Sequence, residues 1–213
     1  MRNYAQREDV REAILDATDQ LLARYGYKKM TIDDLAREAK IGKGTVYLHF
    51  SSKEEIALSH IDRIVERLQG RLSEIAQAEL SPSDKLRQML VTRVLFRFDS
   101  VQHYMQSLND LLAALRPRLL ARRQDYFEEE ARVFAWVLAE GQRAGIFKSG
   151  APLAAAHLLL VATNSLLPYS LSTRELGERK DIKEKITRLA ALLLEGVLRR
   201  DKVKRPASKR AAS

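Results

Sequence analysis

The spacing of the apolar residues is the feature that most constrains the fold of this chain. Nearly everywhere they recur three or four positions apart, as in Val10, Ile14, Ala17 and Leu21, and no run alternates polar and apolar residues over the length of a strand. This spacing places side chains on one face of an α-helix, where they are buried together. The sequence therefore predicts an all-α fold.

Residues that start or stop helices divide this pattern into segments. Gly26 suits the left-handed position that ends a helix, Pro117 suits a first helical turn, and Asp181 with Glu184 forms a capping pair. The helices predicted in this way begin near residues 10, 31, 43, 52, 82, 101, 117, 151 and 181.

Composition excludes several kinds of site. The chain has no cysteine, which rules out disulfides, thiolate-bound metals and a cysteine nucleophile. Its histidines, His49, His60, His103 and His157, show no metal-binding spacing. No apolar stretch approaches the roughly 20 residues that cross a bilayer, and no secretory signal is present. We therefore expect no metal, no cofactor and no membrane partner, and a cytoplasmic protein.

The positive charge is unevenly distributed. Of a formal net charge of +9, the segment 199–213 contributes seven Lys or Arg against one Asp. Residues 201–213 form a basic tail that we expect to be disordered. A second basic stretch runs from Arg24 to Lys53, with seven positive and three negative residues. This stretch is the better candidate for phosphate contacts.

Residues 30–50 have the pattern of a helix-turn-helix. Thr31 with Asp34 forms a variant of the capping box, and the apolar residues that follow give a short helix an inward face. Ile41-Gly42 offers a buried anchor and a permissive backbone for a tight turn. We therefore expect two short helices that meet at a steep angle.

The second of these helices turns a chemically distinctive face outward. Val46 and Phe50, four residues apart, give it an inward edge. The remaining positions offer a cation, a backbone without a side chain, hydroxyls and an imidazole, which suit contacts with phosphates and base edges of duplex DNA. The alternative is that Tyr47 packs in the core. The outward positions are Lys43, Gly44, Thr45, Tyr47, Leu48 and His49.

A longer and more specific pattern covers residues 8–56. It combines Tyr25-Gly26 at the end of the first helix, T-I-D-D-L-A at 31–36 and the run G-x-x-Y-x-H-F-x-x-K-E at 44–54. This pattern resembles the TetR family of bacterial transcriptional regulators. Beyond residue 56 the resemblance rests on length, helical pattern and the segment 141–147.

The resemblance implies an architecture and a function. Residues 7–67 would form an N-terminal three-helix helix-turn-helix DNA-binding domain, and residues 68–200 a C-terminal helical bundle that binds a ligand and dimerises. The implied protein is a regulator, most often a repressor, which binds an inverted-repeat operator in double-stranded DNA as a homodimer and is released by a small-molecule effector.

The resemblance also assigns roles to single residues. In family members the positions of Thr31, Tyr47 and Lys53 bind phosphates, and those of Lys43 and Gly44 approach bases; an ordinary surface lysine is the alternative for Lys53. The predicted DNA-binding residues are Thr31, Gly42, Lys43, Gly44, Thr45, Tyr47, Leu48, His49 and Lys53.

The C-terminal bundle holds the candidates for an effector pocket. Its aliphatic and aromatic stripes contain few inward charges, which favours an apolar or amphipathic ligand such as an acyl chain. Core packing is an equally good interpretation of several of these residues. The candidates are His103, Tyr104, Met105, Phe127, Phe134, Trp136 and Asn164.

The last two predicted helices, 151–167 and 181–199, are implied to form the dimer interface. The polar run Thr163-Asn164-Ser165 interrupts the first of them, and burial without partners is unfavourable. This run must therefore meet a partner helix, a ligand or a kink. The candidate interface residues are Ala155, Leu159, Leu189, Leu193 and Val197.

Two other classes of function are less well supported. An all-helical enzyme or carrier would need a nucleophile and base, a phosphate loop or metal spacing, and none is present in the sequence. We therefore expect no catalytic residues. An interaction module that uses the basic tail on acidic partners is the second alternative, and in that case the tail would be essential.

Overall fold

The computed structural model describes residues 2–168 and 177–198, without the side chains of residues 2–6 and 106. Apart from one isolated β-bridge between Phe147 and Leu198, the regular structure of this part of the chain is helical. The predicted all-α fold class is confirmed. The predicted basic tail, residues 201–213, lies outside the described residues.

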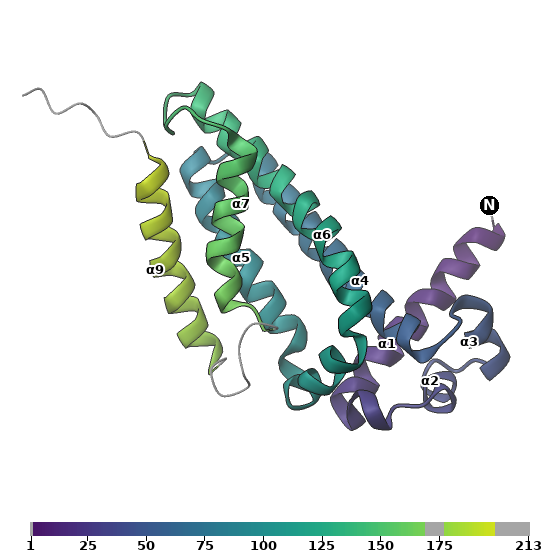
Figure 1. The fold of residues 1–213 in the computed structure, drawn as a ribbon. Helices are drawn as coiled ribbons and strands as arrows, with labels where there is room; N and C mark the ends of the chain where they lie inside the picture. The colour runs from purple at the N-terminus through teal and green to yellow at the C-terminus, as the bar shows by residue number, and fades with distance from the viewer. Residues whose placement is uncertain (1, 169–176, 199–213) are drawn as a thin grey trace, which may run out of the picture.

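The helices form two ends joined by long elements (Figure 1). α1–α3 form one end of the molecule, α7 and α9 lie at the other, and α4 and α6 run between them. The bounds are α1 Arg2–Lys29, α2 Ile32–Glu38, α3 Lys43–His49, α4 Lys53–Gln77, α5 Pro82–Val101, the 3₁₀ turn η1 Gln102–Tyr104, α6 Met105–Arg143, α7 Pro152–Thr163, the 3₁₀ turn η2 Asn164–Leu166 and α9 Arg179–Val197.

Local capping explains where the short N-terminal helices begin. The Thr31 side chain accepts a hydrogen bond from the Asp34 amide, and the Asp34 carboxylate accepts one from the Thr31 amide, so the predicted capping box is confirmed. Ser52 accepts from the Glu55 amide at the start of α4. These side chains satisfy amides that have no partner within the helix.

The break in α1 occurs at the predicted glycine. Gly26 has φ 72° and ψ 167°, and Tyr27–Lys29 add one further turn beyond it. A Cβ at this position would lie 2.8 Å from the Cβ of Ser107 in α6. Both the positive φ and the close approach to α6 therefore require glycine here.

Pro117 does not begin a helix. The predicted pair of helices, starting near 101 and 117, is a single helix, α6, that contains Pro117. Leu111 and Leu115 before the proline and Phe134 after it are all buried. Packing on both sides of the proline outweighs the loss of one backbone hydrogen bond within α6.

The start of α9 also differs from its prediction. The capping box there is formed by Glu178 and Asp181, three residues before the predicted pair of Asp181 and Glu184. Glu184 instead lies on the surface and pairs with Arg188. Several overlapping acidic residues fit the same local pattern, so the sequence alone does not select the box that forms.

The hydrophobic core joins the N-terminal helices to the rest of the molecule. Buried residues of α1–α4, among them Leu21 and Phe50, form one cluster with Tyr104, Leu108 and Leu111. α6 is thus part of the packing that supports α2 and α3. A second cluster fills the space among α4, α5, α6, α7 and α9.

We predict that Gly26→Ala destabilises the protein by about 1–3 kcal/mol, because alanine is strained at a positive φ and its Cβ would collide with Ser107. Denaturant unfolding followed by circular dichroism measures this loss. Gly70→Ala is the matched control, since Gly70 lies within α4 with open space around its Cα; equal effects of the two substitutions would contradict the assignment.

Candidate nucleic-acid interface and core cavity

The short helix α3 is anchored by two side chains and presents the others to solvent. Val46 and Phe50 are 0% and 2% exposed, whereas Tyr47 and Leu48 are 51% and 75% exposed. The inward and outward positions predicted for this helix therefore agree with the structure. A large phenol and a leucine left in water contribute little to the stability of their own subunit, which marks this face as a contact surface.

The predicted DNA-binding residues lie at the start of α2, along α3 and at the start of α4. Thr31, Gly42, Lys43, Gly44, Tyr47 and Leu48 are exposed, and Thr45, His49 and Lys53 are half-buried. Gly44 has open space around the position of a Cβ. The packing of the subunit therefore does not require glycine at this position.

Lys43 is held by an ion pair within its own subunit. Its ammonium donates to Asp33 Oδ2 at 2.9 Å, and both side chains are more than half exposed. The hydrogen bond and the charge of Asp33 raise the pKa of Lys43, so the lysine stays protonated. Any approach of Lys43 to a phosphate or a base competes with this pair.

Thr31 and Lys53 already have partners in the structure. The Thr31 hydroxyl donates to Asp34 Oδ2 at 2.6 Å, and this bond contributes most to the lowered pKa of Asp34. The Lys53 ammonium donates to the carbonyls of Tyr27 and Met30 at 3.1 and 3.2 Å and lies 4.5 Å from the centroid of the Tyr27 ring. Lys53 thus fastens α4 to the end of α1, a role that sequence reasoning missed.

A cavity of about 440 Å³ lies in the core among α4, α5 and α6. This volume is typical of sites for small molecules. Aliphatic side chains make up much of the wall, and arginines with one glutamate supply charge. The main lining residues are Ile61, Ile64, Val65, Arg93, Arg97, Tyr104, Leu108, Leu111, Leu112, Arg116, Leu119, Arg123, Tyr126, Phe127 and Glu130.

Two of the predicted pocket residues, Tyr104 and Phe127, line this cavity. His103 and Met105 border a separate depression between α1, η1 and the start of α9. Asn164 lies behind the wall and is bonded to Arg93.

The predictions for Phe134 and Trp136 as pocket residues are wrong. Phe134 is fully buried in the second hydrophobic cluster, and Trp136 is 49% exposed beneath the ammonium of Lys85. Both lie farther along α6 than Glu130, the last cavity residue of that helix. The helical stripe that suggested them continues past the end of the cavity.

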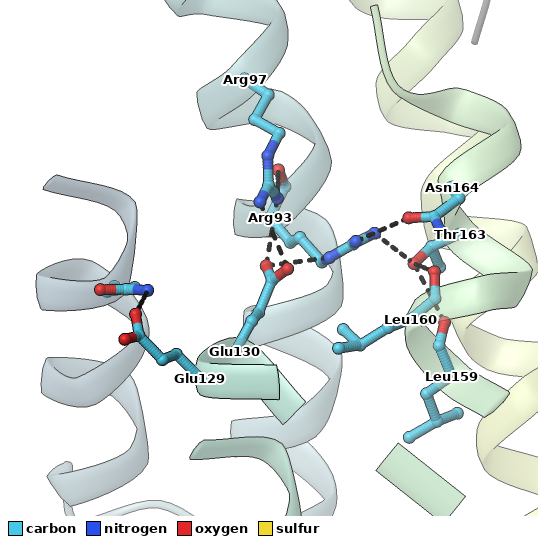
Figure 2. Close-up of polar contacts among 9 residues, drawn as sticks. Arg93, Arg97, Glu129, Glu130, Leu159, Leu160, Thr163 and Asn164 are labelled. Carbon is cyan, nitrogen blue, oxygen red and sulfur yellow. Dashed lines mark hydrogen bonds and ion pairs between the residues drawn. The ribbon is translucent and has the colours of Figure 1, made fainter. Parts of the chain in front are cut away.

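Sequence reasoning missed a buried polar network at the cavity wall (Figure 2). Arg93 donates to Glu130 Oε1 at 2.9 Å, to Thr163 Oγ1 at 2.8 Å and to Asn164 Oδ1 at 2.7 Å. Arg97 donates to both carboxylate oxygens of Glu130, at 3.1 and 3.2 Å. The network accounts for Thr163 and Asn164 of the predicted polar run. Its sequence signal was two arginines four residues apart within the largely apolar stretch 89–98.

Comparison with known proteins agrees with this geometry. Residues 14–59, which run from the buried stripe of α1 into α4, match the family model for bacterial regulatory proteins of the tetR family. The chain belongs to the TetR family. Its relatives are transcriptional regulators, and the family is not enzymatic.

Two curated relatives show how far the likeness to TetR family members extends. A helix-turn-helix transcriptional regulator of Lactococcus lactis subsp. lactis is 39% identical over 83 residues, which are 38% of this chain and 42% of that protein. The fatty acid metabolism regulator protein of Bacillus subtilis (strain 168) is 24% identical over 188 residues, which are 86% of this chain and 93% of that protein. The chain thus spans less than half of the first relative and nearly all of the second.

A solved structure extends the likeness to the whole fold. The crystal structure of a TetR-family transcriptional regulator from Pectobacterium atrosepticum has a TM-score of 0.70 and 22% identity, and the match covers 93% of this chain and 98% of that one. At this identity the similarity concerns the fold alone.

In this TetR family chain, α7 and α9 carry an exposed apolar face. Leu158, Val161 and Leu192 are 71%, 58% and 67% exposed. Of the predicted dimer residues, Ala155, Leu189, Leu193 and Val197 are half-buried. Leu159 is only 3% exposed because it packs into the second cluster of its own subunit. Leu159 is therefore not available to a second copy, and the exposed side of α7 is that of Leu158 and Val161.

The described residues contain neither a candidate membrane span nor a candidate metal site. No helix among them is long and apolar enough to span a bilayer. No group of three or more His, Asp or Glu side chains in this part of the chain is arranged to hold a metal ion.

We predict that Asp33→Asn strengthens binding to DNA about two- to fivefold at low salt, because it releases Lys43 and removes a negative charge beside the predicted DNA-binding residues. The measurement is fluorescence anisotropy across a salt series, in which the gain should shrink as salt rises. Glu74→Gln, which breaks an exposed pair with Arg71 on α4, makes the same change in net charge and should have no such effect.

Proposed function

We propose that this TetR family protein is a repressor that binds an inverted-repeat operator as a homodimer and is released when a small molecule occupies the core cavity. The observation that carries the proposal is the exposed face of α3, where Tyr47 and Leu48 lie in solvent and Gly44 has open space around it. In this proposal residues 7–67 bind DNA, residues 68–200 bind the ligand and dimerise, and the protein acts in the cytoplasm.

α3 is the proposed recognition helix. Lys43 and Gly44 at its start approach base edges in the major groove, and the hydroxyls of Tyr47 and Thr45 bind phosphates. Thr31 and Lys53 contribute phosphate contacts from the starts of α2 and α4. Lys53 does so with an ammonium that already has two carbonyl partners.

An inverted-repeat operator has two half-sites, so a protein with one recognition helix per subunit needs two subunits to bind both. Two half-sites one helical turn apart require two recognition helices about 34–36 Å apart. The exposed apolar face of α7 and α9 supports a dimer in which these helices meet those of a second copy, because leaving Leu158 and Leu192 in water is unfavourable. The DNA-binding helices lie at the opposite end of the molecule (Figure 1).

The cavity supports control by a ligand. Tyr104, Leu108 and Leu111 line it and also pack against the N-terminal helices. A ligand that binds more tightly to a conformation with α6 displaced therefore changes the separation of the two recognition helices. The operator affinity can fall by no more than the factor by which the ligand prefers that conformation. The name of the Bacillus subtilis relative supports an effector with an acyl chain.

We predict that Tyr47→Phe weakens operator binding about ten- to a hundredfold, the effect of losing one hydrogen bond to a charged phosphate. The operator is first selected by the purified protein from fragments of its source genome, and affinity is then measured by gel shift.

Tyr25→Phe is the matched control for this prediction, since Tyr25 is similarly exposed but lies at the end of α1. Neither variant should change the melting temperature by more than a degree or so, because both side chains are about half exposed. Unaltered affinity in Tyr47→Phe would remove Tyr47 from the interface.

We predict that Leu158→Glu gives monomers in sedimentation velocity, because it places a charge at the centre of an apolar contact. Operator binding should be lost with the dimer, while the helical circular dichroism spectrum is retained. Leu80→Glu changes another exposed leucine, outside α7 and α9, and should leave the dimer intact. A protein that sediments as a monomer before any substitution contradicts the proposed dimer.

A further inference from the structure

The helix that links the two ends of the molecule contains a proline. Pro117 lies inside α6, which runs unbroken from Met105 to Arg143. Proline has no amide hydrogen, so the carbonyl of Ala113, four residues earlier, has no partner in the helical ladder, and the proline ring crowds it. Sharp bends in helices occur mostly at such positions. Pro117 is therefore the point at which α6 bends most easily.

The two halves of α6 belong to different parts of the core. In the N-terminal arm, residues 105–116, Leu111 is buried in the cluster formed by α1–α4. In the C-terminal arm, residues 118–143, Phe134 is buried in the second cluster, with residues of α5, α7 and α9. The boundary between the two hydrophobic clusters thus crosses α6 at the proline.

The N-terminal arm is fastened to α1. A Cβ on Gly26 would lie 2.8 Å from the Cβ of Ser107, so α1 and this arm touch directly. The Lys28 ammonium donates to Asp110 Oδ1 at 2.7 Å one turn further along. Because closely packed elements move together, the N-terminal arm and α1 behave as one body.

Few contacts hold the middle of α6 in place. From Arg116 to Glu129 no residue is buried, whereas Leu115 and Glu130 on either side are 1% and 2% exposed. This stretch forms part of the cavity wall and is otherwise largely exposed to solvent. Segments with few buried contacts deform at a lower free-energy cost than packed ones.

The start of the C-terminal arm is nevertheless tied to α4. The Asp62 carboxylate accepts hydrogen bonds from the Arg122 guanidinium and from the Tyr126 hydroxyl. Leu115 is buried in the first cluster on the other side of the proline. These two attachments confine bending to the turn around Pro117.

The cavity is lined by both arms of α6. Leu108 and Leu112 contribute to its wall from the N-terminal arm, and Tyr126 and Phe127 from the C-terminal arm. A molecule that fills the cavity therefore touches both arms, and it favours the angle between them that gives it the better contacts.

We propose that Pro117 is a hinge at which the N-terminal arm of α6, together with α1–α3, changes its angle to the rest of the molecule. The regulatory role of this hinge rests on the proposed function, and the inference adds the place in α6 at which an occupant of the cavity acts. α6 runs between the two ends of the molecule (Figure 1), so a small bend at this turn displaces α3 by a larger distance.

The test measures distances across the hinge by double electron–electron resonance on the full-length protein without ligand. The chain has no cysteine, so two introduced cysteines are the only sites for spin labels. Lys29→Cys with Arg143→Cys spans the hinge, since both residues are exposed and lie on opposite sides of it. Labelled protein is mixed with an excess of unlabelled protein, so that a dimer carries one labelled pair.

A second pair, Arg143→Cys with Lys183→Cys, lies wholly on the C-terminal side of the hinge. The amide of Lys148, shortly after α6, bonds to the carbonyl of Val197 at the end of α9, so these two helices form one body. We expect the distance distribution across the hinge to be about twice as wide as that of the second pair, because hinge motions have the larger amplitude.

The variant Pro117→Ala locates the hinge. Alanine restores the amide that bonds to the Ala113 carbonyl, so the distribution across the hinge should narrow to about the width of the second pair. Pro152→Ala is the matched control, because Pro152 lies in the first turn of α7, where no helical hydrogen bond is missing. It should leave the distribution across the hinge unchanged.

Equal widths for the two pairs in the protein with Pro117 overturn the proposal, and this comparison holds even where Pro117→Ala does not fold. An unchanged width in a folded Pro117→Ala variant also overturns it, since the motion then lies elsewhere. Gel shift with the unlabelled protein tests the proposed function separately. A protein that binds its operator but shows equal widths contradicts only the hinge.

Discussion

The packing of α6 against the N-terminal helices is the interaction on which the other features of the molecule depend. Tyr104, Leu108 and Leu111 are buried in the same cluster as residues of α1–α4. The same side chains form part of the cavity wall. Because close-packed side chains transmit small displacements instead of absorbing them, a displacement of this part of α6 would reach α1 and α4, against which it packs. Gly26 contributes by allowing α1 to approach α6 closely.

The surface of α3 contrasts with this buried support. Val46 and Phe50 fix the helix, so Tyr47 and Leu48 can stay exposed without loss of structure. Lys43 is already paired with Asp33, so a contact of Lys43 with DNA would compete with that pair.

Buried charge distinguishes the core of this protein from a simple apolar bundle. Arg93, Arg97 and Glu130 connect α5 to α6, and Arg93 continues to Thr163 and Asn164 at the end of α7. Such a network contributes less to stability than apolar packing of the same volume, because the charges lose their hydration. What it does provide is a polar connection among α5, α6 and the end of α7 at the cavity wall.

The sequence by itself determined the all-α fold and the N-terminal helix-turn-helix. Both rest on contacts between residues close together in the chain, such as the Thr31–Asp34 capping box and the pair of Val46 and Phe50, so a local pattern specifies them. Tertiary structure decided where Lys53 donates its hydrogen bonds and which residues line the cavity.

Tertiary structure also decided three further features. They are the continuity of α6 through Pro117, the burial of Leu159 and the ion pair between Arg93 and Glu130. Each of these depends on side chains far apart in sequence. A helical stripe specifies that a residue is buried, but only the packing of several helices specifies which neighbours it meets.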